Sequence, residues 1–227
     1  MAVRRVARVL GWTLIGASLL IFAFLGYQLF VTDLIAKGSQ QQASRELDHW
    51  WTEVRTTLPS PQIVTTSIPT LPQIVLYPEE PVDEGKSFAR ILIPSLEVDE
   101  VVFEGVGRKT LKKGPGHMPS TPLPGQPGNA VISGHRTTYG RPFYDLNELA
   151  PGDLIQIETA IGIHSYQVRE SLLVKPTDVW VTEERAGSWL TLTTCHPRYS
   201  AKQRLIIVAE LVEGPNFEYA QVVLAAA

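Results

Sequence analysis

A long series of short β-type segments, separated by glycine and proline, restricts the fold of this chain more than any other feature. Between Lys86 and Gly214 these segments read FARILIP, EVDEVVFEG, NAVISG, DLIQIET, HSYQVRESLLV, WLTLTT and RLIIVAEL. Seven or eight strands in about 130 residues indicate an all-β domain over 86–214, either a closed barrel or a sandwich. ETAIGIHS predicts a hairpin with Gly162 near its turn.

The N-terminal segment predicts a membrane anchor. Residues 9–32 carry no formal charge and are mostly apolar. At about 1.5 Å per residue they would cover roughly 36 Å, enough for a hydrocarbon core of about 30 Å. Three arginines precede them, so the positive-inside rule predicts a cytoplasmic N-terminus over 1–8, a signal-anchor helix over 9–35 and an extracellular remainder. A cleaved signal peptide is the alternative, but AFLGYQLF lacks its small-x-small site.

Residues 36–85 predict an extracellular stalk. Its polar first part, 38–57, is expected to be a helix just above the membrane, with Trp50 and Trp51 at the lipid interface, or a frayed continuation of the span. Six prolines over 58–85 interrupt helices and remove backbone donors, which favours a semi-extended spacer. The tail 215–227 has no clear assignment and is either docked on the β domain or frayed.

Composition and short motifs exclude several classes of function. The formal net charge of −3 does not suggest a nucleic-acid-binding protein. One cysteine cannot form an intramolecular disulfide. The chain has no HxH, HExxH or CxxC spacing and no glycine-rich phosphate loop after a strand. We therefore predict no metal, no nucleotide and no other cofactor.

Three side chains at predicted strand ends could together perform cysteine chemistry. Cys195 follows the run WLTLTT, and Arg204 opens the run RLIIVAEL. If 190–195 and 204–211 are antiparallel neighbours, the thiol and the guanidinium reach one small site. His135 ends another strand after Gly134 and can act as the proton-transfer partner of a thiolate, while arginine can stabilise an oxyanion. Each residue alone also fits a structural role, such as a buried thiol, a surface arginine or a loop histidine.

The other histidines are weaker candidates for this role. His196 follows Cys195 directly, so in a strand its side chain would point the other way. His164 alternates with apolar residues and is expected to face solvent, and His117 is expected to be structural.

The motif combination resembles the sortase family of membrane-anchored cysteine transpeptidases. TLTTC is followed by Arg204, and sixty residues separate His135, in Gly134-His135-Arg136, from Cys195. The stretch GPGHMPSTPLPGQPGNAVISGHRTTYG is most similar to class E sortases, with class D next. The resemblance covers roughly residues 86–212 and implies the eight-stranded closed sortase barrel with short helices.

The resemblance also implies an activity and a set of partners. Cys195 would attack the Thr–Gly carbonyl of a C-terminal sorting signal of the LPxTG or LAxTG type and form a thioacyl enzyme. His135 would exchange protons with the leaving and incoming amines, and Arg204 would hold the substrate or the oxyanion. The acceptor amine would belong to a peptidoglycan precursor or a pilin lysine. Tyr139 and Thr194 would line the substrate groove.

Two further hypotheses remain open at the level of sequence. A cysteine peptidase or another cell-wall transpeptidase would use the same residues, although TTCHPR lacks the glycine of the SxGCxR-like L,D-transpeptidase context. A non-catalytic, membrane-anchored extracellular β domain for adhesion or assembly would not need Cys195.

Overall fold

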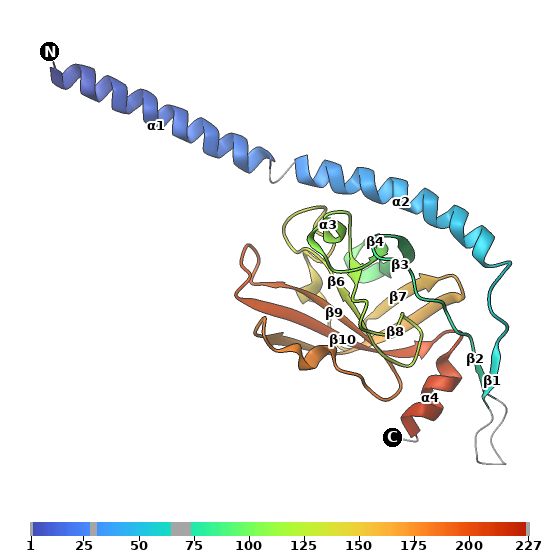
Figure 1. Cartoon of the computed structure of the whole chain (residues 1–227). Coiled ribbons are helices and arrows are strands. Elements are labelled where there is room, and N and C mark those ends of the chain that lie inside the picture. Colours follow the sequence, from blue (N-terminus) through green and yellow to red (C-terminus); the bar gives the residue numbers. More distant parts are fainter. Residues whose placement is uncertain (1, 28–30, 65–73, 226–227) are drawn as a thin grey trace.

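A computed structural model of the chain describes residues 2–27, 31–64 and 74–225. Eight strands form a closed barrel in the order β10-β8-β7-β3-β4-β5-β6-β9 (Figure 1). Their bounds are β3 (Ser87–Ile93), β4 (Val98–Glu104), β5 (Gly116–His117), β6 (Gly128–Ser133), β7 (Leu154–Thr159), β8 (Gly162–Val174), β9 (Ser188–His196) and β10 (Gln203–Glu213). The predicted all-β fold is confirmed, and closure of the sheet decides for a barrel over a sandwich.

The barrel is held by one apolar interior to which every long strand contributes. Its members include Ile91, Ile93, Ile132, Ile155, Ile157, Tyr166, Leu190, Leu192 and Ile207, all nearly or fully buried. β4–β5 and β6–β9 pair in parallel, and the other neighbours pair antiparallel. Closure also pairs the backbone groups that an open sheet would expose at its edges.

Two local predictions about strand pairing are confirmed. β7 and β8 form a hairpin in which Thr159 pairs with Gly162, whose φ of 140° suits glycine. β9 and β10 are antiparallel neighbours, and Arg204 lies opposite Cys195. Short helices interrupt the strands: η2 (Pro94–Leu96), α3 (Arg108–Leu111), η3 (Leu146–Glu148) and η4 (Val179–Thr182).

The N-terminal helix α1 (Ala2–Gly26) extends away from the barrel (Figure 1). Residues Arg4–Gly26 are long and apolar enough to cross a membrane, with a mean hydropathy of 2.1, and make no buried contact. This candidate span starts and ends earlier than the predicted 9–35. Residues 32–35 instead belong to the next helix, α2 (Thr32–Val54).

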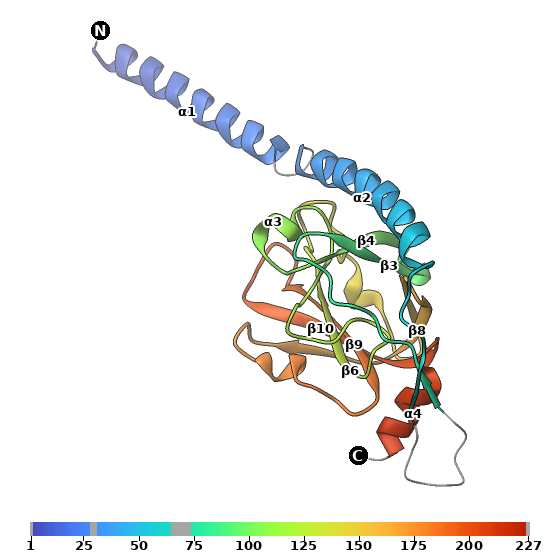
Figure 2. The ribbon, with the colours of Figure 1, turned by 45° about the vertical axis from the view of Figure 1, so that its right-hand side comes forward.

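Helix α2 lies along the outside of the barrel (Figures 1 and 2). Ala43, Leu47 and Trp51 of α2 form a buried cluster with Val101, Phe103 and Ala160 of the barrel. Trp51 is only 4% exposed, and its Nε1–H donates to the carbonyl of Phe88 at 3.3 Å. The expectation that Trp51 lies at the lipid interface is therefore wrong, because its indole is used to attach α2 to the barrel. The predicted stalk over 36–85 thus begins with a helix that contacts the domain directly.

The segment after α2 and the C-terminal tail meet at one side of the barrel. β1 (Gln62–Val64) and β2 (Ile74–Leu76) form a two-stranded antiparallel sheet. The tail forms α4 (Phe217–Ala225), and Ala220 packs into the barrel core. The Asn216 side chain accepts from the backbone N–H of Tyr77 at 2.8 Å and donates to its carbonyl at 3.0 Å. The tail is therefore docked, which resolves the alternative that the sequence leaves open.

Candidate active site

The ends of β6 and β9 bring His135 and Cys195 to one rim of the barrel. The two strands are parallel, and their ladder ends with Ser133 opposite Thr193, two residues before the histidine and the cysteine. Two hydrogen bonds extend the contact beyond the ladder: Gly134 N–H donates to Thr193 O at 3.1 Å, and Thr194 Oγ1 donates to Gly134 O at 2.8 Å. The imidazole and the thiol therefore leave the sheet at the same end.

Arg204 reaches the same rim from the neighbouring strand. It pairs with Cys195 in the β9–β10 ladder and is half-buried. Its Nη1 donates to the carbonyls of Ala201 and Gln203, both at 3.1 Å, so the turn between the strands orients the guanidinium. Cys195 itself is a free, half-buried thiol. Thr194, the next residue toward the strand interior, is buried, and its hydroxyl is used in the bond to Gly134.

His135 is surrounded by groups that favour its neutral form. Burial, and secondly the charge of Lys112, lower the pKa of His135 below its ordinary value of 6.5. The ring of Tyr139 lies beside the imidazole, with 5.1 Å between centroids and 38° between planes. The Lys112 ammonium lies 5.3 Å from the Tyr139 ring centroid. A neutral imidazole at physiological pH can accept a proton from a thiol or an incoming amine.

Gly134 is required by packing beneath the rim. A Cβ atom at Gly134 would lie 2.5 Å from the ring of Phe143, which is fully buried. A core phenylalanine thus approaches the backbone closely at this glycine. Its ring supports the backbone from which His135 projects.

A buried arginine, Arg136, contacts the backbone of the candidate nucleophile Cys195. In the sequence it stood out only as part of the Gly134-His135-Arg136 motif. Arg136 is 4% exposed, and its Nη1 donates to the carbonyl of Cys195 at 3.2 Å. The same nitrogen lies 2.9 Å from His196 Nδ1. Nη2 donates to Asn147 Oδ1 at 2.6 Å and Nε to Tyr144 O at 3.2 Å. In the sequence, the position of Arg136 next to His135 was the available signal. Its burial comes from contacts with Tyr144, the η3 loop and the Cys195–His196 segment.

A second arginine completes this support from the outside. The Arg198 guanidinium stacks on the Tyr144 ring, 4.2 Å from its centroid, and donates to Asp145 and Asn147. Burial, and secondly the charge of Arg198, lower the pKa of Arg136, and the charge of Asp145, followed by those of Cys195 and Tyr144, opposes the shift. Arg136 thus holds the backbone of Cys195, and Arg198 binds the same Tyr144–Asn147 segment that holds Arg136.

His164 is placed differently from its prediction. It is fully buried rather than solvent-facing, and its Nε2 lies 3.2 Å from Thr159 Oγ1. The loop at Gly125 covers it so closely that a Cβ there would lie 2.1 Å from the ring. Burial lowers the pKa of His164 to about 4. This histidine lies near the Thr159–Gly162 turn and is not part of the rim that carries Cys195.

His117 has the structural role expected of it. It is buried, with Nδ1 2.8 Å from Glu104 Oε2 and Nε2 2.9 Å from the carbonyl of Pro122. Within the described residues, no group of three or more His, Cys, Asp or Glu side chains is arranged to hold a metal ion.

Comparison with known proteins agrees with this geometry. A sequence model of the sortase domain matches residues 91–212. Sortase SrtE1 of Streptomyces coelicolor is 30% identical over 223 residues, which are 91% of this chain and 57% of that protein. Sortase D of Bacillus subtilis is 29% identical over 51% of this chain, again covering 57% of the relative. The chain thus spans little more than half the length of these two relatives.

Solved sortase structures share the barrel. A Clostridium perfringens sortase D5 transpeptidase aligns over 79% of this chain and 99% of its own, with a TM-score of 0.60 and 26% identity. Sortase E of Streptomyces avermitilis aligns over 58% of this chain and 91% of its own, with a TM-score of 0.54 and 38% identity. Because the sortase-domain model matches residues 91–212, more than half of the chain, the chain belongs to the sortase family.

Proposed function

We propose that this chain is a membrane-anchored sortase that transfers proteins from a C-terminal sorting signal to an amine. The observation that carries the proposal is the strand register, which brings Cys195, His135 and Arg204 to one rim of a sortase-family barrel. These three residues are proposed as the catalytic group. Tyr139, beside the imidazole, and Thr194 are proposed to line the substrate groove.

The proposed reaction has two acyl-transfer steps. Neutral His135 first takes the proton of the Cys195 thiol. The resulting thiolate attacks the carbonyl carbon of the Thr–Gly bond in an LPxTG- or LAxTG-type signal, the C–N bond breaks, and a thioester forms. The glycine-side amine leaves with a proton from His135. The acceptor amine then attacks the thioester, gives its proton to His135 and releases the thiolate. Arg204 donates hydrogen bonds to the oxyanion of each tetrahedral intermediate or to the bound signal.

The proposed setting follows from the N-terminal helix. The apolar part of α1, within the candidate span Arg4–Gly26 rather than 9–35, would anchor the chain in the cell membrane with its N-terminus in the cytoplasm and the barrel outside, because Arg4, Arg5 and Arg8 lie at the N-terminal end of that span. The partners would be surface proteins that carry the sorting signal and an acceptor amine from a peptidoglycan precursor or a pilin lysine.

The full chain in detergent micelles or nanodiscs, incubated with LPxTG and LAxTG peptides and a soluble amine, tests the proposal. Mass spectrometry should detect a new amide product with wild type and none with Cys195→Ala. Hydrolysis without amide formation would indicate a cysteine peptidase. No turnover, together with a Cys195→Ala variant that retains its cellular role, would favour the non-catalytic β domain.

A further inference from the structure

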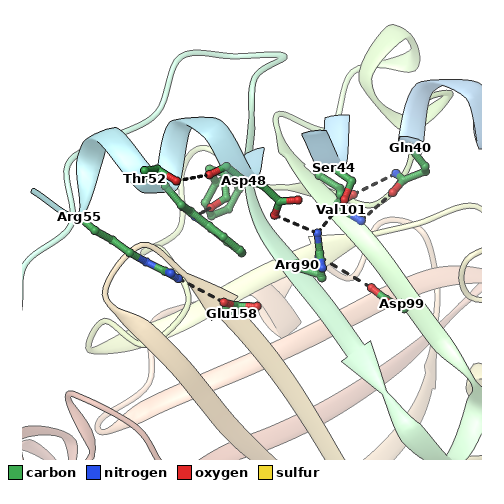
Figure 3. Close-up of polar contacts among 11 residues, drawn as sticks. Gln40, Ser44, Asp48, Thr52, Arg55, Arg90, Asp99, Val101 and Glu158 are labelled. Atoms are coloured by element: carbon green, nitrogen blue, oxygen red, sulfur yellow. Dashed lines mark hydrogen bonds and ion pairs between the residues drawn. The ribbon is translucent and has the colours of Figure 1, made fainter. Parts of the chain in front are cut away.

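Helix α2 is fastened to the barrel along its length. The Gln40 side chain accepts from Val101 N–H at 2.7 Å and donates to the Val101 carbonyl at 3.1 Å, as a neighbouring strand would (Figure 3). It also donates to the carbonyl of Lys113 at 2.9 Å. One turn later, Ser44 accepts from the guanidinium of Arg90 at 2.7 Å. Such contacts hold α2 at a fixed position relative to β3 and β4.

Farther along α2 the attachment continues with ion pairs. Arg90 also lies 3.4 Å from Asp48, and Arg55 lies 3.2 Å from Glu158 of β7 (Figure 3). The buried cluster around Leu47 lies between these polar contacts in the sequence of α2. The helix is thus a fixed element of the domain, so contacts at its N-terminal end can position other parts of the chain.

The first turn of α2 contacts the loop that follows His135. Asp33 Oδ1 accepts from the backbone N–H of Gly140 at 3.0 Å, and Oδ2 lies 3.4 Å from Arg141 Nε. Ala36 packs so closely that a Cβ at Gly140 would lie 3.3 Å from its methyl group. Asp33 is itself largely shielded, with 18% of its side chain exposed.

The backbone of this loop needs such support. Tyr139, Gly140 and Arg141 are three successive residues with positive φ, at 53°, 80° and 53°. Residues with a Cβ are disfavoured in this left-handed region because the Cβ approaches the carbonyl oxygen. A strained loop of this kind persists only where its surroundings hold it. Asp33 contacts two members of the strained triplet, the backbone N–H of Gly140 and the side chain of Arg141.

The held loop in turn defines the environment of the imidazole. Tyr139 begins the triplet, and its ring lies 5.1 Å from that of His135. The Lys112 ammonium also lies near this ring, 5.3 Å from its centroid. Displacement of the triplet would therefore move the ring that covers His135.

We infer that Asp33 is a positioning residue, through which the helix next to the membrane anchor holds Tyr139 against His135. This inference rests on the proposed function only in so far as His135 is the catalytic base. Asp33 lies seven positions after Gly26, the end of the candidate span, a path of at most about 25 Å. The rim that carries Cys195 thus lies close to the membrane end of the chain, and docking of α2 completes it.

The test uses the full chain in nanodiscs and compares Asp33→Ala and Asp33→Asn with wild type. Asp33→Ala should lower kcat for amide formation by about ten- to a hundredfold, and KM for the peptide should rise as well, because Tyr139 is also proposed to line the substrate groove. Asp33→Asn should be intermediate, because its amide oxygen still accepts from Gly140 N–H while the ion pair with Arg141 is lost. Asp48→Ala is the matched control, since it removes another α2 acid that contacts the barrel far from this loop.

A second measurement separates positioning from general loosening of the structure. In histidine-labelled protein, the NMR titration of His135, assigned from its loss in His135→Gln, should shift toward 6.5 in Asp33→Ala because the ring becomes hydrated. Asp48→Ala should leave this titration unchanged. Equal kcat and equal His135 titration in wild type and Asp33→Ala would overturn the inference. If wild type forms no amide, the proposed function fails, and the titration still decides whether Asp33 positions the loop.

Discussion

The guanidinium of Arg136 donates a hydrogen bond to the main-chain carbonyl of Cys195 at 3.2 Å, from a position that is 96% buried. Because the same group bonds His196, Asn147 and Tyr144, one side chain fixes the turn on which the thiol sits. It also places a permanent positive charge near a thiolate at this position.

Replacement of Arg136 should therefore lower the reactivity of the Cys195 thiol and also destabilise the fold. For Arg136→Lys we expect alkylation of Cys195 by iodoacetamide at pH 7 to slow on the order of tenfold, or about 1.4 kcal/mol in barrier. Lysine keeps a charge but cannot reproduce the planar set of donors. Arg169→Lys, in an exposed pair with Glu210, is the control and should alkylate at the wild-type rate. Equal rates in the two variants would contradict a role for Arg136 at the nucleophile.

Removal of the Leu47 side chain should reveal that α2 belongs to the folded domain. Leu47 is fully buried between α2 and the barrel, so Leu47→Ala should lower the free energy of unfolding by about 2–5 kcal/mol. Leu34 lies on the same helix but is 68% exposed, and Leu34→Ala should change it by less than about 0.5 kcal/mol. Chemical denaturation of the full chain in micelles measures both. A stalk independent of the barrel would show no difference between the variants.

A methyl group at Gly134 should disturb the rim from below. In Gly134→Ala the new Cβ would meet the Phe143 ring at 2.5 Å, so either the ring or the backbone before His135 must shift. We expect amide formation to fall about tenfold or more and the protein to lose about 1–3 kcal/mol of stability. The double variant Gly134→Ala/Phe143→Leu should recover part of the activity, because the smaller side chain makes room. Gly38→Ala, at an open helical position, is the control. Additive losses in the double variant would exclude the steric explanation.

Stability should depend on pH through Glu79. Burial raises the pKa of Glu79 from 4.5 to about 7, against opposing hydrogen bonds from Thr159 and the backbone of Ile161 and Ala160, and its Oε2 has no hydrogen-bond partner among the described residues. The folded state thus holds the proton more tightly than the unfolded chain. Its stabilising contribution is present below about pH 4.5 and is lost as the pH rises through about 7.

The variant Glu79→Gln isolates this contribution. Relative to wild type, its free energy of unfolding should rise by about 1–3 kcal/mol between pH 5 and pH 8, because the amide has no charge to bury. His164 titrates equally in both proteins and cancels from the difference. Glu80→Gln, at an exposed neighbouring residue, should show no such trend. If the difference in the free energy of unfolding between Glu79→Gln and wild type stays constant over this pH range, the pKa of Glu79 is not raised in the folded protein.

The β content, the hairpin at Gly162 and the neighbouring positions of Cys195 and Arg204 could all be predicted from the sequence. Each depends on local signals: alternation along a strand, a glycine at a turn, and a short connection between consecutive strands. The sixty-residue spacing from His135 to Cys195 pointed to the same site only through resemblance to a family. The parallel β6–β9 ladder that joins these two residues pairs segments far apart in the chain, and no local pattern specifies it.

The burial of individual side chains could not be predicted from the sequence, because it depends on tertiary contacts. Trp51 and His164 occupy positions whose local patterns suggested exposure, yet the barrel wall buries the first and the loop at Gly125 buries the second. Arg136 is indistinguishable in sequence from a surface arginine until the η3 loop closes over it. Asp33 lies within the segment that hydropathy assigns to the anchor, but α2 carries it to the loop beside His135. The sequence alone determined where the strands end, because alternation and turn residues are local signals. Only the tertiary structure determined the burial and the electrostatic environment of the side chains at those ends, because both depend on neighbours from distant segments of the chain.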